Sequence, residues 1–182
     1  SAGEYGARRV ALGQATPPPV SSSVIVPPAA DHRGGCNNAW VIDAVKSIGA
    51  ALKGRDHYHV VNITSTVMPG STQGPIRQAL EAASGKVVGV DVGLCYNPEF
   101  IALGSVVRDM LFPDSILIGE SDSKAGDMLQ TIYLQMCEKP PPVQRMTLLN
   151  AELTKISFNT YVPTKISYPK TQADTSPNHH AP

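Results

Sequence analysis

Between residues 24 and 148 the hydrophobic positions follow two different spacings. Short runs that are mostly apolar predict buried strands. These runs lie at 24–26, 58–64, 92–96 and 115–119, and a fifth strand is expected at 144–148. In the intervening segments apolar residues recur every three or four positions, which predicts helices. Strands that alternate with helices are typical of crossover connections, so we expect an α/β fold with a parallel sheet.

Side chains that can cap a helix precede four of the predicted helices. The first candidates are Asn37 or Asn38, and Asp122 or Ser123 would open the helix after the strand at 115–119. Ser71 or Thr72 follows the strand at 58–64 and would open the helix after it. The last helix is expected to begin just after Asn150, its N-cap. Pro163 falls inside that helix, and an interior proline costs about 3 kcal/mol. We therefore expect a kink or an end near Thr160.

The two ends of the chain differ in composition from the middle. Residues 1–23 contain proline and serine runs typical of a linker, so we expect an irregular segment. Residues 169–182 are polar and are expected to form a disordered tail. The pattern divides the rest into an α/β domain at 24–148 and a separate helical segment at 149–168.

Composition excludes several classes of protein. Hydrophobic residues make up 42% of the 182 residues and the formal net charge is zero. A sizeable core is possible, and nothing basic favours nucleic acid or an anionic membrane. No apolar run approaches the roughly 18 residues of a membrane span, and no signal peptide is expected. Three cysteines without metal-binding spacing argue against a disulfide framework or a metal site and favour a reducing cytoplasm. They are Cys36, Cys95 and Cys137.

Polar residues follow two of the predicted strands at the edge where ligands bind in α/β sheets. Ser65, Thr66, Pro69 and Gly70 come directly after the strand at 58–64. Small hydroxyls and a Pro-Gly turn allow close approach of a ligand, and the N-terminus of the following helix favours negative charge. A plain strand–turn–helix connection with Ser71 as the cap explains the same residues.

Further polar candidates lie after the strand at 92–96 and on the last helix. Glu99 could act on substrate or water, or it could only cap a turn. Glu152, Lys155 and Asn159 have the spacing that places them on one face of a helix. That face could offer donors to a ligand, or it could be a solvent-facing stripe with an ordinary Glu–Lys pair.

Four strings, taken in order, resemble the central part of UDP-glucose dehydrogenases and their UDP- and GDP-sugar relatives. They are STVMPGS, GLCYNPEFIALGS, RDMLFPDSILIGESD and NAELTKISFNTYVPTKIS, and the resemblance runs from about Val24 to about Tyr168. It implies that residues 24–148 are the second half of a Rossmann-like NAD-binding domain. The helix after them would begin the linking region that forms a homodimer in the intact parent.

The resemblance also implies roles for individual residues. Enzymes of this family oxidise the C6 alcohol of a nucleotide sugar to the uronic acid with NAD, as in polysaccharide biosynthesis. Thr66 would lie near the nicotinamide, with Ser65, Pro69 and Gly70 beside the cofactor. Glu99 would lie beside the reacting carbon, touching both cofactor and substrate. Lys155 and Asn159 would stabilise the developing oxyanion, which suits an ammonium and an amide N–H. Substrate contacts are expected from Phe100, Ile101, Leu103, Lys155 and Asn159.

The sequence departs from the family pattern at several points. The GxGxxG turn and the acidic residue for the ribose are absent. None of the three cysteines has the context of the family's nucleophile. Leu103 stands where bacterial members often carry a second glutamate, and Ser115 replaces an arginine.

Three hypotheses follow from these observations. The chain is a piece of an NAD-dependent nucleotide-sugar dehydrogenase, a non-catalytic nucleotide- or partner-binding module of the same fold, or an unrelated α/β protein with coincidental motifs. We expect that the chain alone does not catalyse the reaction, because the cofactor turn and the nucleophilic cysteine are missing.

Overall fold

The computed structural model describes residues 20–27, 29–30, 36–100 and 104–175. A five-stranded sheet with the order β1-β4-β5-β6-β7 forms the centre. Its strands are β1 (Ser21–Val24), β4 (His59–Ile63), β5 (Val92–Tyr96), β6 (Ile116–Glu120) and β7 (Val143–Thr147). The two-residue strands β2 (Ala29–Ala30) and β3 (Cys36–Asn37) make a separate antiparallel pair.

The sheet is mostly parallel, with one antiparallel junction. Strand β4 pairs in parallel with β1 and β5, and β7 pairs in parallel with β6. Between β5 and β6 the pairing is antiparallel. The expected α/β class is confirmed, whereas an all-parallel sheet is wrong at this junction. The connection from β5 to β6 contains α3 (Val106–Leu111), a six-residue helix with no buried residue. Such a helix cannot cover the sheet as a crossover helix does, so the chain returns in the opposite direction.

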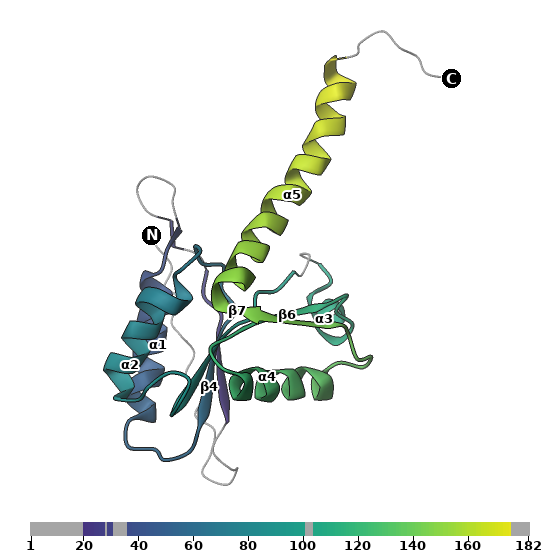
Figure 1. Ribbon diagram of the computed structural model, residues 1–182. Helices are drawn as coiled ribbons and strands as arrows, with labels where there is room; N and C mark the ends of the chain where they lie inside the picture. The colour runs from purple at the N-terminus through teal and green to yellow at the C-terminus, as the bar shows by residue number, and fades with distance from the viewer. Residues whose placement is uncertain (1–19, 28, 31–35, 101–103, 176–182) are drawn as a thin grey trace.

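Helices cover both faces of the sheet (Figure 1). They are α1 (Ala39–Leu52), η1 (Thr72–Ile76), α2 (Arg77–Ser84), α4 (Ser123–Met136) and α5 (Leu148–Thr175). Helices α1 and α2 lie together on one face, and α4 lies on the other. The first turns of α5 join the α1–α2 side, and the rest of α5 projects away from the domain.

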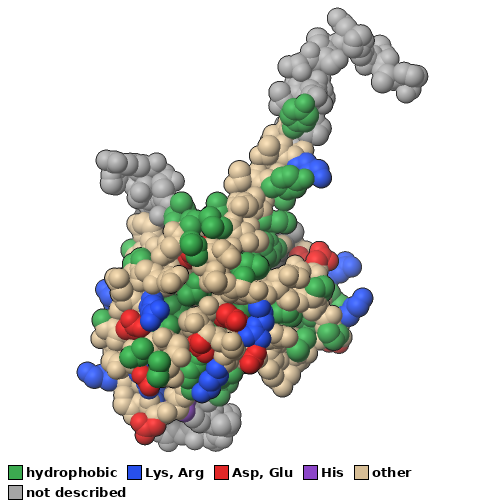
Figure 2. All heavy atoms as spheres, in the orientation of Figure 1, with side chains coloured by type: hydrophobic (Ala, Val, Ile, Leu, Met, Phe, Trp, Pro, Cys, Tyr) green, Lys and Arg blue, Asp and Glu red, His purple; other side chains and the backbone are tan. Residues whose placement is uncertain are grey.

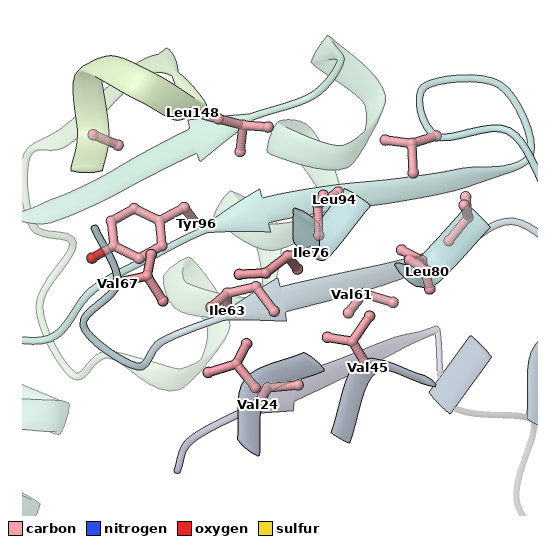
Figure 3. Close-up of a cluster of buried hydrophobic side chains, with 14 of the residues drawn as sticks. Val24, Val45, Val61, Ile63, Val67, Ile76, Leu80, Leu94, Tyr96 and Leu148 are labelled. Carbon is pink, nitrogen blue, oxygen red and sulfur yellow. The ribbon is translucent and has the colours of Figure 1, made fainter. Parts of the chain in front are cut away.

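Alternating side chains of the strands fill two separate cores. Val61 and Leu94 point toward the α1–α2 side, where Val45 and Leu80 meet them (Figure 3). Their neighbours along the strands point the other way, and Ala125 and Leu129 of α4 cover them. Those neighbours include Val60, Cys95, Ile116 and Ile118. Both faces of the central strands are therefore buried, which explains why their sequence reads as continuous apolar runs.

Several boundaries differ from the sequence-based expectations. Strand β1 begins at Ser21, within the segment that was expected to be irregular, and ends at Val24. Helix α5 begins at Leu148, so Asn150 lies in its first turn and is not the N-cap. The Thr147 hydroxyl instead accepts a hydrogen bond from the Asn150 amide at 3.3 Å. Because this hydroxyl belongs to the last residue of β7, strand and helix follow each other without a loop.

Helix α5 continues through Pro163 to Thr175, so the expected end near Thr160 is wrong. Two contacts bridge the proline. The Thr164 hydroxyl donates to the Thr160 carbonyl at 2.8 Å, and the Lys165 ammonium lies 5.5 Å from the centroid of the Tyr161 ring. Residues 169–175, expected to be a disordered tail, are helical. The remaining parts of the two expected irregular ends, 1–19 and 176–182, lie outside the described residues.

Candidate functional site

Thr66 and Glu99 lie at the same edge of the sheet. Ile63 and Tyr96 are the last residues of the parallel strands β4 and β5 and are paired in register. The Asn97 amide donates to the Ile63 carbonyl at 2.9 Å, which extends this pairing beyond β5. Thr66 lies three residues after the end of β4, and Glu99 lies three residues after the end of β5. The sequence thus delivers a hydroxyl and a carboxylate to the carboxyl edge of neighbouring strands.

Helix α5 reaches this edge because β6 and β7 run opposite to β5. The chain leaves β7 within the sheet, and α5 turns back toward the carboxyl ends of β4 and β5 (Figure 1). Close packing at its first turn requires a glycine in β6. A Cβ added to Gly119 would lie 2.7 Å from the Cβ of Ala151 and 3.1 Å from the Cα of Leu148. The missing side chain lets α5 lie directly on the strand.

Lys155 of α5 contacts the loop after β5. Its ammonium donates a hydrogen bond to the backbone carbonyl of Glu99. The same ammonium lies 4.6 Å from the centroid of the Phe100 ring, and Phe158 packs edge-on against that ring at 4.8 Å. Lys155 is only 8% exposed. Burial lowers the pKa of Lys155, and the negative charge of Glu99 partly opposes this shift.

Glu152 contacts the turn after β4. Its side chain is fully buried, and its carboxylate accepts the backbone amides of Gly70 at 2.6 Å and Thr72 at 2.7 Å. Ser71, which was expected to cap this helix, makes no side-chain cap hydrogen bond. Its hydroxyl accepts from the Asn38 side chain at 2.9 Å. A carboxylate from α5 therefore takes the place of the local cap, because it reaches two amides at once.

The remaining cofactor-side candidates have different surroundings. The Ser65 hydroxyl accepts from the Val26 amide at 2.7 Å and donates to the Val26 carbonyl at 2.9 Å, so it joins the ends of β1 and β4. Thr66 is half-buried, while Pro69 and Gly70 are exposed. Gly70 has a φ of 87°, which a residue with a side chain rarely adopts.

The solvent-facing stripe considered for α5 is wrong for two of its three residues. Glu152 and Lys155 are buried and contact backbone groups of two different loops. Asn159 and the Glu99 side chain are exposed. Ile101 and Leu103, expected to contact substrate, lie outside the described residues. The structure thus brings Lys155 to the Glu99 loop and Glu152 to the Thr66 turn.

A cavity of about 250 Å³ lies beside the same loop, on the α4 side of the sheet. It is lined by Thr64, Asn97, Glu99 and Phe100, with apolar residues of α3 and α4 around them. The Tyr133 hydroxyl donates to the Asn97 side chain, whose amide donates to the Leu117 carbonyl at 2.7 Å. Burial, followed by the charges of Cys137 and Glu99, raises the pKa of Tyr133 to about 12. The sequence patterns did not identify this asparagine–tyrosine pair.

Comparison with known proteins identifies the family. The sequence profile of the UDP-glucose/GDP-mannose dehydrogenase family, NAD binding domain, matches residues 21–137. The chain belongs to this family. NAD is therefore the cofactor of the domain to which these residues correspond, as the resemblance implied.

Individual relatives agree with this assignment. A GDP-mannose 6-dehydrogenase of Pseudomonas aeruginosa is 31% identical over 147 residues, which are 81% of this chain and 33% of the relative. A UDP-glucose 6-dehydrogenase of Haloferax volcanii is 36% identical over 126 residues, 68% of this chain and 29% of the relative. The chain thus spans about a third of the length of the relatives it matches.

Solved structures show the same fold. A ternary complex of GDP-mannose dehydrogenase from Pseudomonas aeruginosa superposes with a TM-score of 0.76 at 30% identity. The superposition covers 81% of this chain and 33% of the solved structure. A UDP-glucose dehydrogenase from Pyrobaculum islandicum gives a TM-score of 0.74 at 29% identity, with the same coverage of both chains. The Rossmann-like α/β fold predicted for this chain is confirmed, with the antiparallel β5–β6 junction as its one departure from the predicted parallel sheet.

Two kinds of feature are absent from the described residues. Within them, no helix is both long and apolar enough to cross a bilayer. The same residues contain no group of three or more His, Cys, Asp or Glu side chains that could hold a metal ion.

Proposed function

We propose that this chain is part of an NAD-dependent nucleotide-sugar 6-dehydrogenase that oxidises the C6 alcohol of a UDP- or GDP-sugar to the uronic acid. The observation that carries this proposal is the contact of Lys155 with the Glu99 loop. It joins the helix expected to stabilise an oxyanion to the strand end expected to lie beside the reacting carbon. A surface helix with an ordinary lysine would not bury its ammonium against that loop.

Within this proposal each residue has a distinct task. Lys155, preorganised by its contact with Glu99, stabilises negative charge that develops on the sugar oxygen, and a buried ammonium does this more strongly than a hydrated one. Asn159 lies one helical turn further and is exposed, so its amide is free to point at a substrate above the edge. Thr66 offers a hydroxyl from the neighbouring strand end. NAD, when bound, accepts the hydride.

The residues present fit only part of the cofactor. A pyrophosphate is usually held by free backbone amides at a helix N-terminus. After β4 the amides of Gly70 and Thr72 already donate to Glu152, and the sequence contains no GxGxxG turn. Thr66, Pro69 and Gly70 could contact the nicotinamide side. We therefore expect weak NAD binding by this chain alone.

Substrate binding would also require residues beyond this chain. The cavity beside Glu99 and Phe100 has about 250 Å³, below the roughly 300–1,000 Å³ of typical ligand pockets. A nucleotide sugar would extend beyond it.

We propose in addition that the projecting helix forms a homodimer contact in the intact parent. Along α5 the space-filling view shows mainly uncharged and hydrophobic side chains (Figure 2). The exposed large hydrophobic residues of this helix are Leu149, Leu153, Phe158, Tyr161, Val162 and Tyr168. We place the protein in a reducing cytoplasm, where the free, buried Cys95 and Cys137 would stay reduced.

The test has two parts. The chain alone, given NAD and UDP-glucose or GDP-mannose, should produce no NADH by absorbance. Residues 21–175 should then replace the matching segment of the Pseudomonas GDP-mannose dehydrogenase. In an active chimera, Lys155→Ala should lower kcat by roughly 100-fold or more. Lys165→Ala, on the same helix but exposed, should leave kcat unchanged. A chimera that keeps its full kcat after the Lys155→Ala substitution would refute the proposed role of Lys155.

A further inference from the structure

Glu152 is a fully buried carboxylate whose two oxygens are both engaged. Oε2 accepts the Gly70 amide at 2.6 Å and Oε1 accepts the Thr72 amide at 2.7 Å. A buried charge without partners is strongly unfavourable. Here two charge-assisted hydrogen bonds from backbone amides compensate for burial. This geometry therefore requires a carboxylate, since no other side chain of similar size offers two acceptor oxygens.

Lys155 lies one turn further along the same helix and contacts the other loop of the site. Glu152 binds the turn that follows Thr66, and the Lys155 ammonium binds the carbonyl of Glu99. Two successive turns of α5 therefore connect the loops after β4 and after β5. The position of one loop relative to the other depends on α5.

We propose that Glu152 is a positioning residue that holds the turn after Thr66 in register with Lys155. The inference rests on the proposed function, in which Thr66 and Lys155 serve the same substrate. Glu152 itself would touch neither substrate nor cofactor, because both of its oxygens face backbone amides of the turn. It acts through the backbone of Gly70 and Thr72.

The same contact occupies two backbone amides of the turn after β4. An anion that used the amides of Gly70 and Thr72 would first have to displace the Glu152 carboxylate. These two amides therefore serve the alignment of α5 and are not available to a phosphate while Glu152 accepts them.

The test uses the purified 182-residue chain. Lysine acylation by an N-hydroxysuccinimide ester, followed by mass spectrometry, gives a labelling rate for each lysine. Buried Lys155 should react slowly in the wild type, and exposed Lys46 and Lys53 serve as internal references. In Glu152→Gln one of the two amides loses its acceptor. We expect Lys155 labelling and deuterium uptake by residues 67–73 to rise about tenfold, the effect of losing a hydrogen bond to a charged group.

A core variant separates positioning from general loss of stability. Val45→Ala removes packing in the middle of α1, whereas the hydrogen bonds of Glu152 and Lys155 go to the loops after β4 and β5. It should lower Tm at least as much as Glu152→Gln but leave Lys155 labelling slow well below Tm. Glu152→Asp, which keeps the charge, should give an intermediate rate. Equal labelling of Lys155 in wild type and Glu152→Gln, or equal acceleration in Val45→Ala, would overturn the proposal. Because the readout is the position of Lys155, it is independent of whether Lys155 catalyses the reaction.

Discussion

Replacing Gly119 by alanine tests how closely α5 packs on the sheet. The new Cβ would lie 2.7 Å from the Ala151 Cβ, 3.1 Å from the Leu148 Cα and 3.3 Å from the Thr147 carbonyl oxygen. Two of these three neighbours are backbone atoms and cannot rotate away. Overpacking of this kind costs about 1–3 kcal/mol. For a chain of this size 1 kcal/mol corresponds to about 2–4 °C in Tm, so we expect a decrease of roughly 2–12 °C.

The substitution Ala151→Gly tests whether the loss of stability in Gly119→Ala comes from the contact between these two residues. Alone it should destabilise by about 1 kcal/mol, because glycine disfavours the helix. Combined with Gly119→Ala it removes the closest clash, so the double variant should be more stable than the sum of the single effects predicts, by at least about 1 kcal/mol. Urea unfolding followed by circular dichroism measures all four chains. Additive effects, within about 0.5 kcal/mol, would refute the reasoning.

Three other predictions follow from single side chains. Burial would raise the pKa of Asp122, but hydrogen bonds from Tyr58, Ser121 and the α4 backbone outweigh it and lower the pKa. Asp122→Asn should therefore lower the free energy of unfolding by about 1–2 kcal/mol above about pH 4. In urea unfolding, the difference between the variant and the wild type should shrink as the pH falls through the lowered pKa of Asp122. Pro163→Ala restores a backbone N–H donor inside α5, so hydrogen exchange of the amides at 160–167 should slow. Unchanged exchange would show that the proline does not weaken the helix at this point. Lys155 should titrate below the ordinary lysine value of about 10.4 by NMR, because burial lowers its pKa. The free energy of unfolding should then rise with pH between the lowered pKa and about 10.4; a titration midpoint at or above about 10.4 would contradict this.

The sequence predicted helices and strands correctly where a single local rule, such as burial or capping, determines them. The apolar run at 92–96 matches β5, because both faces of that strand are buried. Asp122 caps α4 as its sequence position suggests, with its carboxylate accepting the Ala125 amide at 3.0 Å. The cap of η1 was not predictable, because its partner, Glu152, lies 80 residues further along the chain from Thr72. Local capping rules select Ser71, and only tertiary packing shows that a distant carboxylate reaches the same amides.

The assembly of the candidate site depends on the one feature of the sheet that periodicity could not reveal. Strand-end rules place Thr66 and Glu99 at one edge if β4 and β5 are parallel, and they are. The same rules applied to an all-parallel sheet would begin α5 at that edge and carry Lys155 away from it. The antiparallel junction between β5 and β6 reverses β7, so α5 starts within the sheet and rises along it. One turn of this helix then meets the β4 loop through Glu152, and the next meets the β5 loop through Lys155. A weak six-residue helix, α3, permits that reversal; the geometry of the site is therefore set by a segment that contributes no side chain to the buried core.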